Sequence, residues 1–148
     1  MGSATAPQWS TYATERLAHE GFRRGGGRAA VIDWLDSQTC ALTAQEIEDG
    51  LKGGERPVGR ATVYRVLDEL VELGLLSKVE IGDGLSRFET AYPEGAEHHH
   101  HLVCTNCGRL VPFTDDAMER ALRTVVRREG FTMQAHDVTL RGLCAGCA

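Results

Sequence analysis

Two Cys-x-x-Cys pairs near the end of the chain limit how its last third can fold. The pairs are Cys104 with Cys107 and Cys144 with Cys147, and 36 residues separate them. Four thiolates presented from two tight turns suit the tetrahedral, sulfur-rich coordination of structural zinc. A metal held by both pairs would tie the end of this segment to its beginning. The alternative is two unrelated redox pairs or buried thiols, and the repeated spacing favours zinc.

The cellular compartment affects whether the cysteine pairs are read as a zinc site or as redox pairs. The opening residues, MGSATAPQWS, contain no charged stretch followed by an apolar one, so they predict no signal peptide. No apolar run approaches the roughly 20 residues that cross a membrane. We therefore expect a cytoplasmic protein with no membrane partner. Disulfides are rare in a reducing cytosol, so cysteine pairs there more often mark metal or redox sites.

The segment that carries the cysteines, residues 98–148, has the pattern of three strands and one helix. HHLVCTNCGRLVPF predicts two strands around the first pair, DDAMERALRTVVRREG a helix that begins with acids, and FTMQAHDVTLRGLC a third strand. A unit of about fifty residues buries little surface alone. We therefore expect it to need a metal staple and a partner subunit.

The preceding residues, 10–91, have the pattern of a winged helix-turn-helix with one additional helix at its start. Helices are predicted over about 10–21, 29–37, 43–52 and 60–73. The third opens with a capping box formed by Thr43 and Glu46. Two short runs joined by Gly-Asp-Gly at 82–84 predict a hairpin. The polar residues 92–97 predict a hinge, so the fold class is α+β with two domains.

Four consecutive histidines, residues 98–101, precede the first cysteine pair. A purification tag is the trivial explanation, but tags lie at chain ends and this run is internal. In a strand, His98 and His100 would face one side and His99 and His101 the other. Each pair of imidazoles can bind a divalent metal if further ligands are supplied from elsewhere.

Two residues are candidates for those further ligands. Glu119 lies in the first turns of the predicted helix, and His136 shares strand parity with Val138 and Leu140. A carboxylate and an imidazole on otherwise apolar faces are costly unless they are paired or bound to metal. For His136 alone, the alternative is a core histidine satisfied by hydrogen bonds.

Local clusters of arginine matter more for nucleic-acid binding than the formal net charge of -5, which by itself argues weakly against it. Residues 22–30 contain three arginines and no acid, and so do residues 56–65. A solvated surface is the alternative explanation for these arginines.

On the helix 60–73, we expect Tyr64 and Arg65 to contact bases, since arginine pairs with guanine and tyrosine can touch a thymine methyl. Arg60 would meet phosphate. Arg23 or Arg24, in a glycine-rich loop, would reach a minor groove or the backbone.

Taken together, these elements resemble the Fur family of metal-dependent transcriptional repressors. The resemblance rests on GRATVYRVL, HHHHLVCTNCG, AHDVTLRGLC and the final Cys-x-x-Cys, and it covers about residues 15–147. It implies a homodimer, joined through its C-terminal domains, that binds a palindromic operator when loaded with a regulatory divalent metal. The four cysteines match the family's structural zinc site, and Tyr64 and Arg65 match its recognition positions.

The resemblance also implies two regulatory metal sites. One would span the hinge and use His99, His101 and Glu89. Its remaining ligand, commonly a histidine before the third helix, falls at Ala41, so we propose the neighbouring Cys40 as the substitute; a small buried residue is the alternative. The ligands of the second site would be His98, His100, Glu119 and His136.

The expected function is a zinc-sensing repressor of genes for metal uptake or homeostasis, in which metal bound at the hinge holds the two domains in one orientation. A cysteine ligand favours Zn²⁺, whereas a set of only His and Glu leaves Fe²⁺ or Mn²⁺ open. The alternatives are an iron-sensing or peroxide-sensing regulator of the same family, and a zinc-buffering protein without a DNA role. We expect no enzyme. A zinc deaminase, the enzyme class that also combines His, Glu and Cys-x-x-Cys, needs a His-x-Glu motif and a proline before the cysteine pair, and this sequence has neither.

Overall fold

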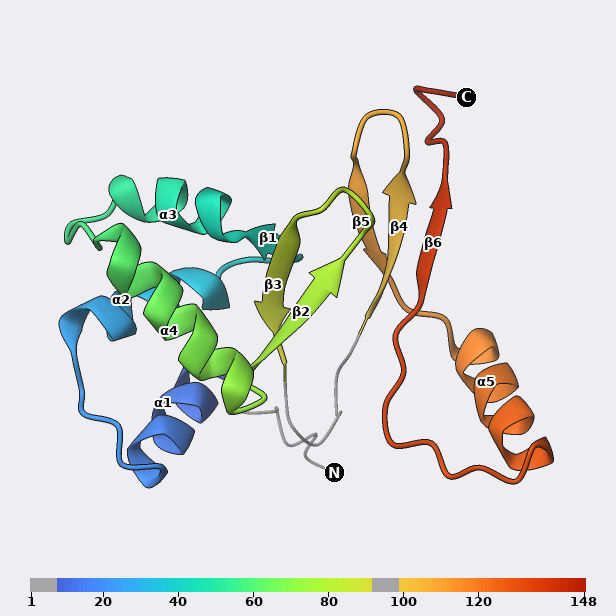
Figure 1. Ribbon diagram of the computed structural model, residues 1–148, viewed down its shortest axis with the longest axis horizontal. Helices are drawn as coiled ribbons and strands as arrows, with labels where there is room; N and C mark the ends of the chain where they lie inside the picture. Colours follow the sequence, from blue (N-terminus) through green and yellow to red (C-terminus); the bar gives the residue numbers. More distant parts are fainter. Residues whose placement is uncertain (1–7, 92–98) are drawn as a thin grey trace, which may run out of the picture. The chain divides into compact units, whose positions relative to one another are not determined.

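The structure, a computed structural model, describes residues 8–91 and 99–148 and divides the chain into two units (Figure 1). The predicted hinge, 92–97, and His98 lie outside the described residues. The described elements of the winged unit are, in chain order, α1 (Trp9–His19), α2 (Gly26–Asp36), β1 (Leu42–Thr43), α3 (Ala44–Lys52), α4 (Arg60–Glu72), β2 (Leu76–Glu80) and β3 (Ser86–Thr90). Those of the C-terminal unit are β4 (His100–Cys104), β5 (Leu110–Phe113), α5 (Asp116–Arg128) and β6 (Thr139–Gly142).

Helix α3 begins where its cap predicts. The Thr43 side chain accepts a hydrogen bond from the Glu46 N–H at 3.1 Å, and the Glu46 carboxylate accepts one from the Thr43 N–H at 2.7 Å. These two bonds satisfy N–H groups that a helix start otherwise leaves open. Ile47 and Leu51 are buried on the inner side of the helix, as their spacing predicts.

Helix α4 has one buried and one exposed face. Its buried residues are Val63, Val66, Leu67 and Leu70, and they pack in one cluster with residues of α2 and α3. On the opposite face of the helix, Ala61, Arg65, Asp68 and Glu72 are exposed. The core therefore fixes α4 by its inner face and leaves its outer face available for contacts.

Helix α1 belongs to the core of the winged unit. Trp9, Ala13 and Leu17 are buried in the same cluster as the α4 residues. The Trp9 indole N–H donates to the carbonyl oxygens of Leu75 at 3.0 Å and Ala91 at 3.2 Å. The first helix, predicted only as an addition to the winged helix-turn-helix, therefore anchors the end of the wing strand β3.

The wing is a hairpin of β2 and β3 joined through Gly82 and Gly84, which both have positive φ angles, 91° and 79°. Glycine adopts this left-handed region without the steric cost that other residues meet. Strand β1, which the sequence did not predict, adds to the hairpin with Leu42 opposite Phe88, and the sheet order is β1-β3-β2.

The C-terminal unit is a sheet of order β5-β4-β6, in which β4 pairs antiparallel with β5 and parallel with β6. The predicted third strand is much shorter than expected. Strand β6 begins at Thr139, so His136 lies in the irregular segment before the strand and the parity assigned to it was wrong.

Helix α5 begins with Asp115, whose side chain accepts a hydrogen bond from the Met118 N–H at 2.7 Å. None of its residues is buried, and the sheet exposes Leu102 (42%) and Leu140 (49%) side by side on β4 and β6. This unit thus leaves apolar surface uncovered within a single chain. No helix among the described residues is long and apolar enough to cross a membrane.

Candidate metal centres and DNA-binding surface

The four predicted cysteines come together at one end of the C-terminal sheet. Parallel pairing sets Cys104 opposite Gly142, so the turns that follow β4 and β6 are neighbours. The sulfur atoms all lie within 4.8 Å of one another, and those of Cys107 and Cys144 are 3.8 Å apart. Zn–S bonds of about 2.3 Å in a tetrahedron place sulfurs about 3.8 Å apart, so the cluster fits such an ion.

The thiols of this cluster differ in acidity. Backbone N–H groups of Cys107, Cys144 and Asn106 lower the pKa of Cys104 to about 6. The Arg109 N–H also lowers the pKa of Cys107, but the neighbouring thiols and burial outweigh it and raise that pKa to about 11. Four thiolates crowd too much negative charge together unless a cation is shared among them.

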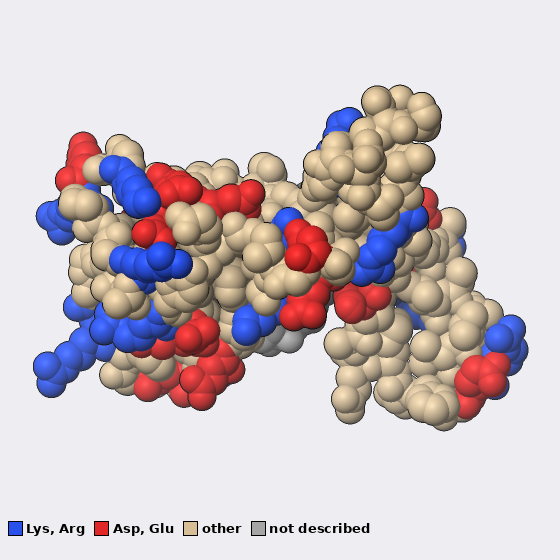
Figure 2. Space-filling view, turned by 45° about the horizontal axis from the view of Figure 1, so that its top comes forward, with Lys and Arg blue, Asp and Glu red and all other residues tan. Residues whose placement is uncertain are grey.

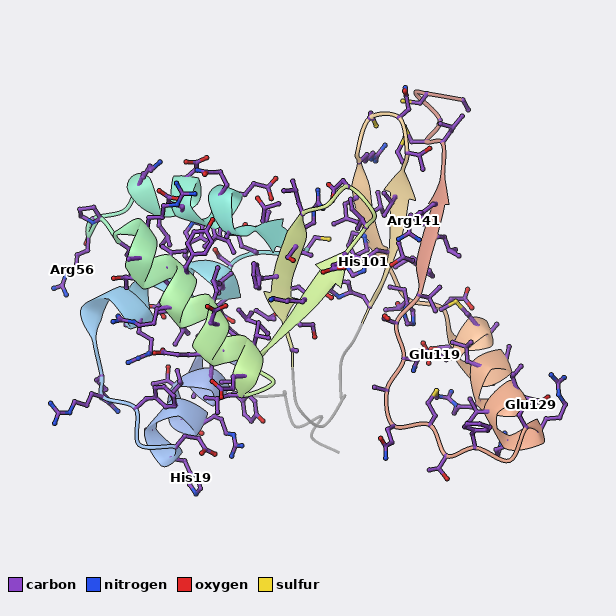
Figure 3. The ribbon with its side chains drawn as sticks, in the orientation of Figure 1. His19, Arg56, His101, Glu119, Glu129 and Arg141 are labelled. Carbon is purple, nitrogen blue, oxygen red and sulfur yellow. The ribbon has the colours of Figure 1, made fainter. Side chains whose placement is uncertain are left out.

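A second group lies where β4 begins, at the opposite end of the strand from Cys104. His100 on β4, Glu119 on α5 and His136 place their ligand atoms within 4.8 Å of one another. The Glu119 carboxylate lies 2.7 Å from His100 Nε2 and 3.0 Å from His136 Nε2. Figure 3 shows Glu119 projecting from α5 toward the segment that precedes β6. Two imidazoles and a carboxylate offer nitrogen and oxygen ligands to a divalent metal.

The His100 ring is fixed in this group. It is 1% exposed, and the Val138 N–H donates to its Nδ1 at 3.1 Å. Because Nδ1 accepts a hydrogen bond, the neutral ring carries its proton on Nε2 and donates it to Glu119. A cation bound at Nε2 must displace that proton. His98, the fourth predicted ligand, lies outside the described residues.

The four ligands predicted for the hinge site are divided between the two units, with two in each. In the winged unit, the pairing of β1 with β3 brings the Cys40 thiol and the Glu89 carboxylate within 4.8 Å of each other. In the C-terminal unit, the rings of His99 and His101 lie on one side of β4 with centroids 5.1 Å apart. Each unit therefore supplies an incomplete ligand set, since a tetrahedral site needs four donors.

The exposed face of α4 carries the predicted DNA contacts. Tyr64 is 41% exposed, and the side chains of Arg60 and Arg65 are 65% and 64% exposed. The Arg60 guanidinium lies 5.5 Å from the centroid of the Tyr64 ring. Arg23 and Arg24 are exposed in the loop between α1 and α2.

Acids lie close to these arginines in space, although residues 56–65 themselves contain none. Glu48 Oε2 lies 3.7 Å from Arg60 Nε, and Glu69 Oε1 lies 3.9 Å from Arg65 Nε. Figure 2 shows basic and acidic side chains side by side over the winged unit. Sequence reasoning missed Glu48, a buried acid on α3 that its helical spacing beside Ile47 and Leu51 could have indicated.

Comparison with known proteins supplies the family. Residues 19–141 match the model of the ferric uptake regulator family. The ferric uptake regulation protein of Bordetella parapertussis is 34% identical over 132 residues, which cover 88% of this chain and 93% of the relative. The peroxide operon regulator of Bacillus subtilis is 29% identical over 136 residues, 92% of this chain and 91% of that protein.

A solved structure agrees with this result. The Helicobacter pylori ferric uptake regulator, described as having three functional metal-binding sites, superimposes with a TM-score of 0.79 at 25% identity and covers 93% of each chain. The winged unit corresponds to the DNA-binding domain and the C-terminal unit to the dimerisation domain. The chain therefore belongs to the ferric uptake regulator family of metal-responsive, DNA-binding transcriptional regulators.

Proposed function

We propose that this regulator is a zinc-sensing repressor that binds a palindromic operator as a homodimer. The observation that carries the proposal is the pair Cys40 and Glu89, whose ligand atoms lie within 4.8 Å of each other in the winged unit. A thiolate beside a carboxylate, completed by the imidazoles of His99 and His101, is a set whose softness favours zinc over iron. The four-cysteine cluster would hold a separate, structural zinc ion.

In this proposal, one metal ion binds both incomplete ligand sets and so connects the two units. The positive charge of a divalent cation offsets the negative charges of the thiolate and the carboxylate, so that these two groups and two imidazoles can lie close together around it. Cys40 and Glu89 restrain the winged unit, and His99 and His101 restrain the C-terminal unit. Metal favours the restrained state only by its differential affinity for that state.

The restrained state would present two recognition helices to DNA. The apolar face around Leu102 and Leu140 is suited to bury against a second copy of the chain, because uncovered apolar surface of this kind marks interfaces. In a symmetric dimer, the two α4 helices reach successive major grooves when they lie one helical turn, or a multiple of it, apart. Tyr64 and Arg65 would then read bases, and Arg60 would bind phosphate.

An iron-sensing or peroxide-sensing regulator is the second candidate. The cluster of His100, Glu119 and His136 supports it, because its ligands are only nitrogen and oxygen and suit iron as well as zinc. If Cys40 is not a ligand, the hinge site also becomes a set of histidines and a carboxylate. Iron and zinc would then be equally suited to this chain.

The test combines metal analysis with DNA binding. The full chain is chelated mildly so that zinc stays in the four-cysteine cluster, and Zn²⁺, Fe²⁺ or Mn²⁺ is restored in turn. Affinity is measured by fluorescence anisotropy on a palindromic duplex selected from a random pool with the zinc-loaded chain. We expect zinc to tighten binding at least a hundredfold, about 2.7 kcal/mol. Equal affinity of the stripped and restored chains would refute the proposal.

Cys40→Ala tests the thiolate ligand, and Thr39→Ala, a change at the neighbouring exposed residue, is its control. We expect the Cys40 variant to bind zinc weakly at the regulatory site and to lose zinc-dependent DNA binding, while the control retains both. Unchanged zinc affinity in Cys40→Ala would show that Cys40 is not a ligand and would favour the iron-sensing candidate.

A further inference from the structure

Arg28, in the first turn of α2, forms its contacts inside the winged unit, unlike the exposed loop arginines Arg23 and Arg24. Its Nε and Nη2 donate to Glu69 Oε2 at 3.1 and 2.8 Å, and its Nη1 donates to the Arg23 carbonyl oxygen at 2.6 Å. Its guanidinium also lies 5.3 Å from the centroid of the Phe22 ring. The side chains of Arg28 and Glu69 are 17% and 18% exposed. With these donors committed within the protein, Arg28 is poorly placed to meet DNA.

The acceptor of this arginine lies on the recognition helix. Glu69 follows Arg65 by one helical turn, and its second carboxylate oxygen, Oε1, is 3.9 Å from Arg65 Nε. That distance is too long for a hydrogen bond, so Arg65 is attracted to the carboxylate but not fixed by it. One carboxylate thus anchors a partly buried arginine with one oxygen and faces an exposed arginine with the other.

The backbone of α2 also lies close to α4. A Cβ atom added to Gly27 would stand 2.9 Å from Thr62 Cγ2, so a side chain at this position would require Thr62 or the helix backbone to shift. The loop that carries Arg23 and Arg24 leads directly into this close approach. Its Arg23 carbonyl is the group that Arg28 binds, which ties the loop to α4 through Glu69.

We propose that Arg28 and Glu69 are positioning residues for DNA binding, which hold the loop arginines Arg23 and Arg24 in a fixed place relative to the base-reading face of α4. This inference rests on the proposed function. A loop held in place loses little conformational entropy on binding, whereas a loose one must be ordered by the DNA itself. The benefit of Arg23 and Arg24 to DNA affinity should therefore depend on Glu69.

A double-mutant cycle tests this dependence. The positioning variant is Glu69→Leu, and its matched control is Glu72→Leu, which removes the same charge from an exposed position on the same helix. Each is combined with the loop variant Arg23→Ala/Arg24→Ala. Affinities for the selected palindromic duplex are measured with the zinc-loaded full chain, and circular dichroism and thermal melting check that each variant is folded.

We expect the loop variant to weaken binding about tenfold in the wild-type and Glu72→Leu backgrounds, but less than about threefold in Glu69→Leu, since coupled residues give non-additive losses. Glu69→Leu should also reduce the slope of log affinity against log salt by about one, as when a phosphate contact is lost. A purely structural role would lower the melting temperature without changing this slope.

Arg28→Lys is the second variant, because it keeps the positive charge but replaces the planar guanidinium, which donates from three separate nitrogens, with a single ammonium nitrogen. It should lose the coupling as Glu69→Leu does, and it keeps the test decisive if Glu69→Leu does not fold. Additive losses in all backgrounds would overturn the inference while leaving the proposed function intact. No metal-dependent binding by the wild-type chain would refute both.

Discussion

We expect that replacing one cysteine of the four-cysteine cluster destabilises the C-terminal unit more than any other single substitution in that unit. Apart from Val103 and Cys104, the buried hydrophobic residues of the described chain all belong to the winged unit. The C-terminal unit therefore has little core of its own. A metal shared by the two cysteine pairs closes a loop of 36 residues between Cys107 and Cys144.

The size of the effect follows from that loop. A cross-link that closes 36 residues removes roughly 4 kcal/mol of entropy from the unfolded chain in the loop-closure treatment. This is a lower bound, because metal–sulfur bonding contributes about 10 kcal/mol or more in small zinc domains. A loss of about 4 kcal/mol corresponds to roughly a thousandfold in an equilibrium constant.

The perturbation is Cys144→Ser, with Cys40→Ser as the control that removes a thiol outside the cluster. Both variants are chelated mildly first, so that no regulatory zinc contributes to the comparison. Hydrogen exchange followed by mass spectrometry should show protection of β4 and β6 falling by at least about a thousandfold in Cys144→Ser, with zinc content reduced. Protection of α4 in the winged unit should be unchanged. If Cys144→Ser loses its zinc and β4 and β6 keep their protection, the metal does not hold this unit together and the reasoning fails.

Three further predictions each follow from one local feature of the structure. Thr43→Ala removes the α3 cap and should destabilise the winged unit by about 1 kcal/mol, a fall of roughly 4–8 °C in melting temperature that a thermal scan would show; an unchanged melt would refute the role of the cap. The Arg87 guanidinium lowers the pKa of Asp83 to about 2, so the wing ion pair should be complete above about pH 4 and lost as pH falls through about 2; an NMR titration of Asp83 near its ordinary pKa would contradict this. Because the pKa of Cys107 is raised to about 11, zinc capture near neutral pH releases its proton, and affinity measured against a competing chelator should rise at least about tenfold per pH unit; a flat profile would contradict it.

The sequence predicted best where its signal is local. The capping box at Thr43, the helix predicted over 60–73 and the glycine turn of the wing each depend on residues a few positions apart, and the structure confirms them. The cysteine pairs share this property, because each pair occupies one turn. Their meeting also needs the parallel pairing of β4 with β6, which no local pattern indicated.

Long-range partners could not be found in the same way. Glu69 lies 41 residues from Arg28, and no periodicity or spacing connects them, so the acid-free stretch around Arg28 gave the impression of a free arginine. Strand β1 has two residues and carries no alternation of its own, because it is formed by pairing with β3. His136 was assigned to a strand from its neighbours' parity, but the segment before Thr139 is irregular.

The ligand assignments remain predictions of different kinds. The geometry groups His100, Glu119 and His136 within one unit, where local packing determines their distances. The proposed hinge site would divide its ligands between two units, so its completion would depend on an arrangement that the cation itself imposes. Cys40 is the residue on which the choice of metal rests.

The most direct test of the account measures whether regulatory metal restrains the two units. Small-angle X-ray scattering is recorded on the full chain with zinc in the four-cysteine cluster, before and after regulatory zinc is added, and on Glu89→Gln as the variant with an incomplete hinge site. The account predicts a narrower distribution of interatomic distances on zinc addition in the wild-type chain, and no narrowing in Glu89→Gln. Identical scattering from the wild-type chain with and without regulatory zinc would contradict it.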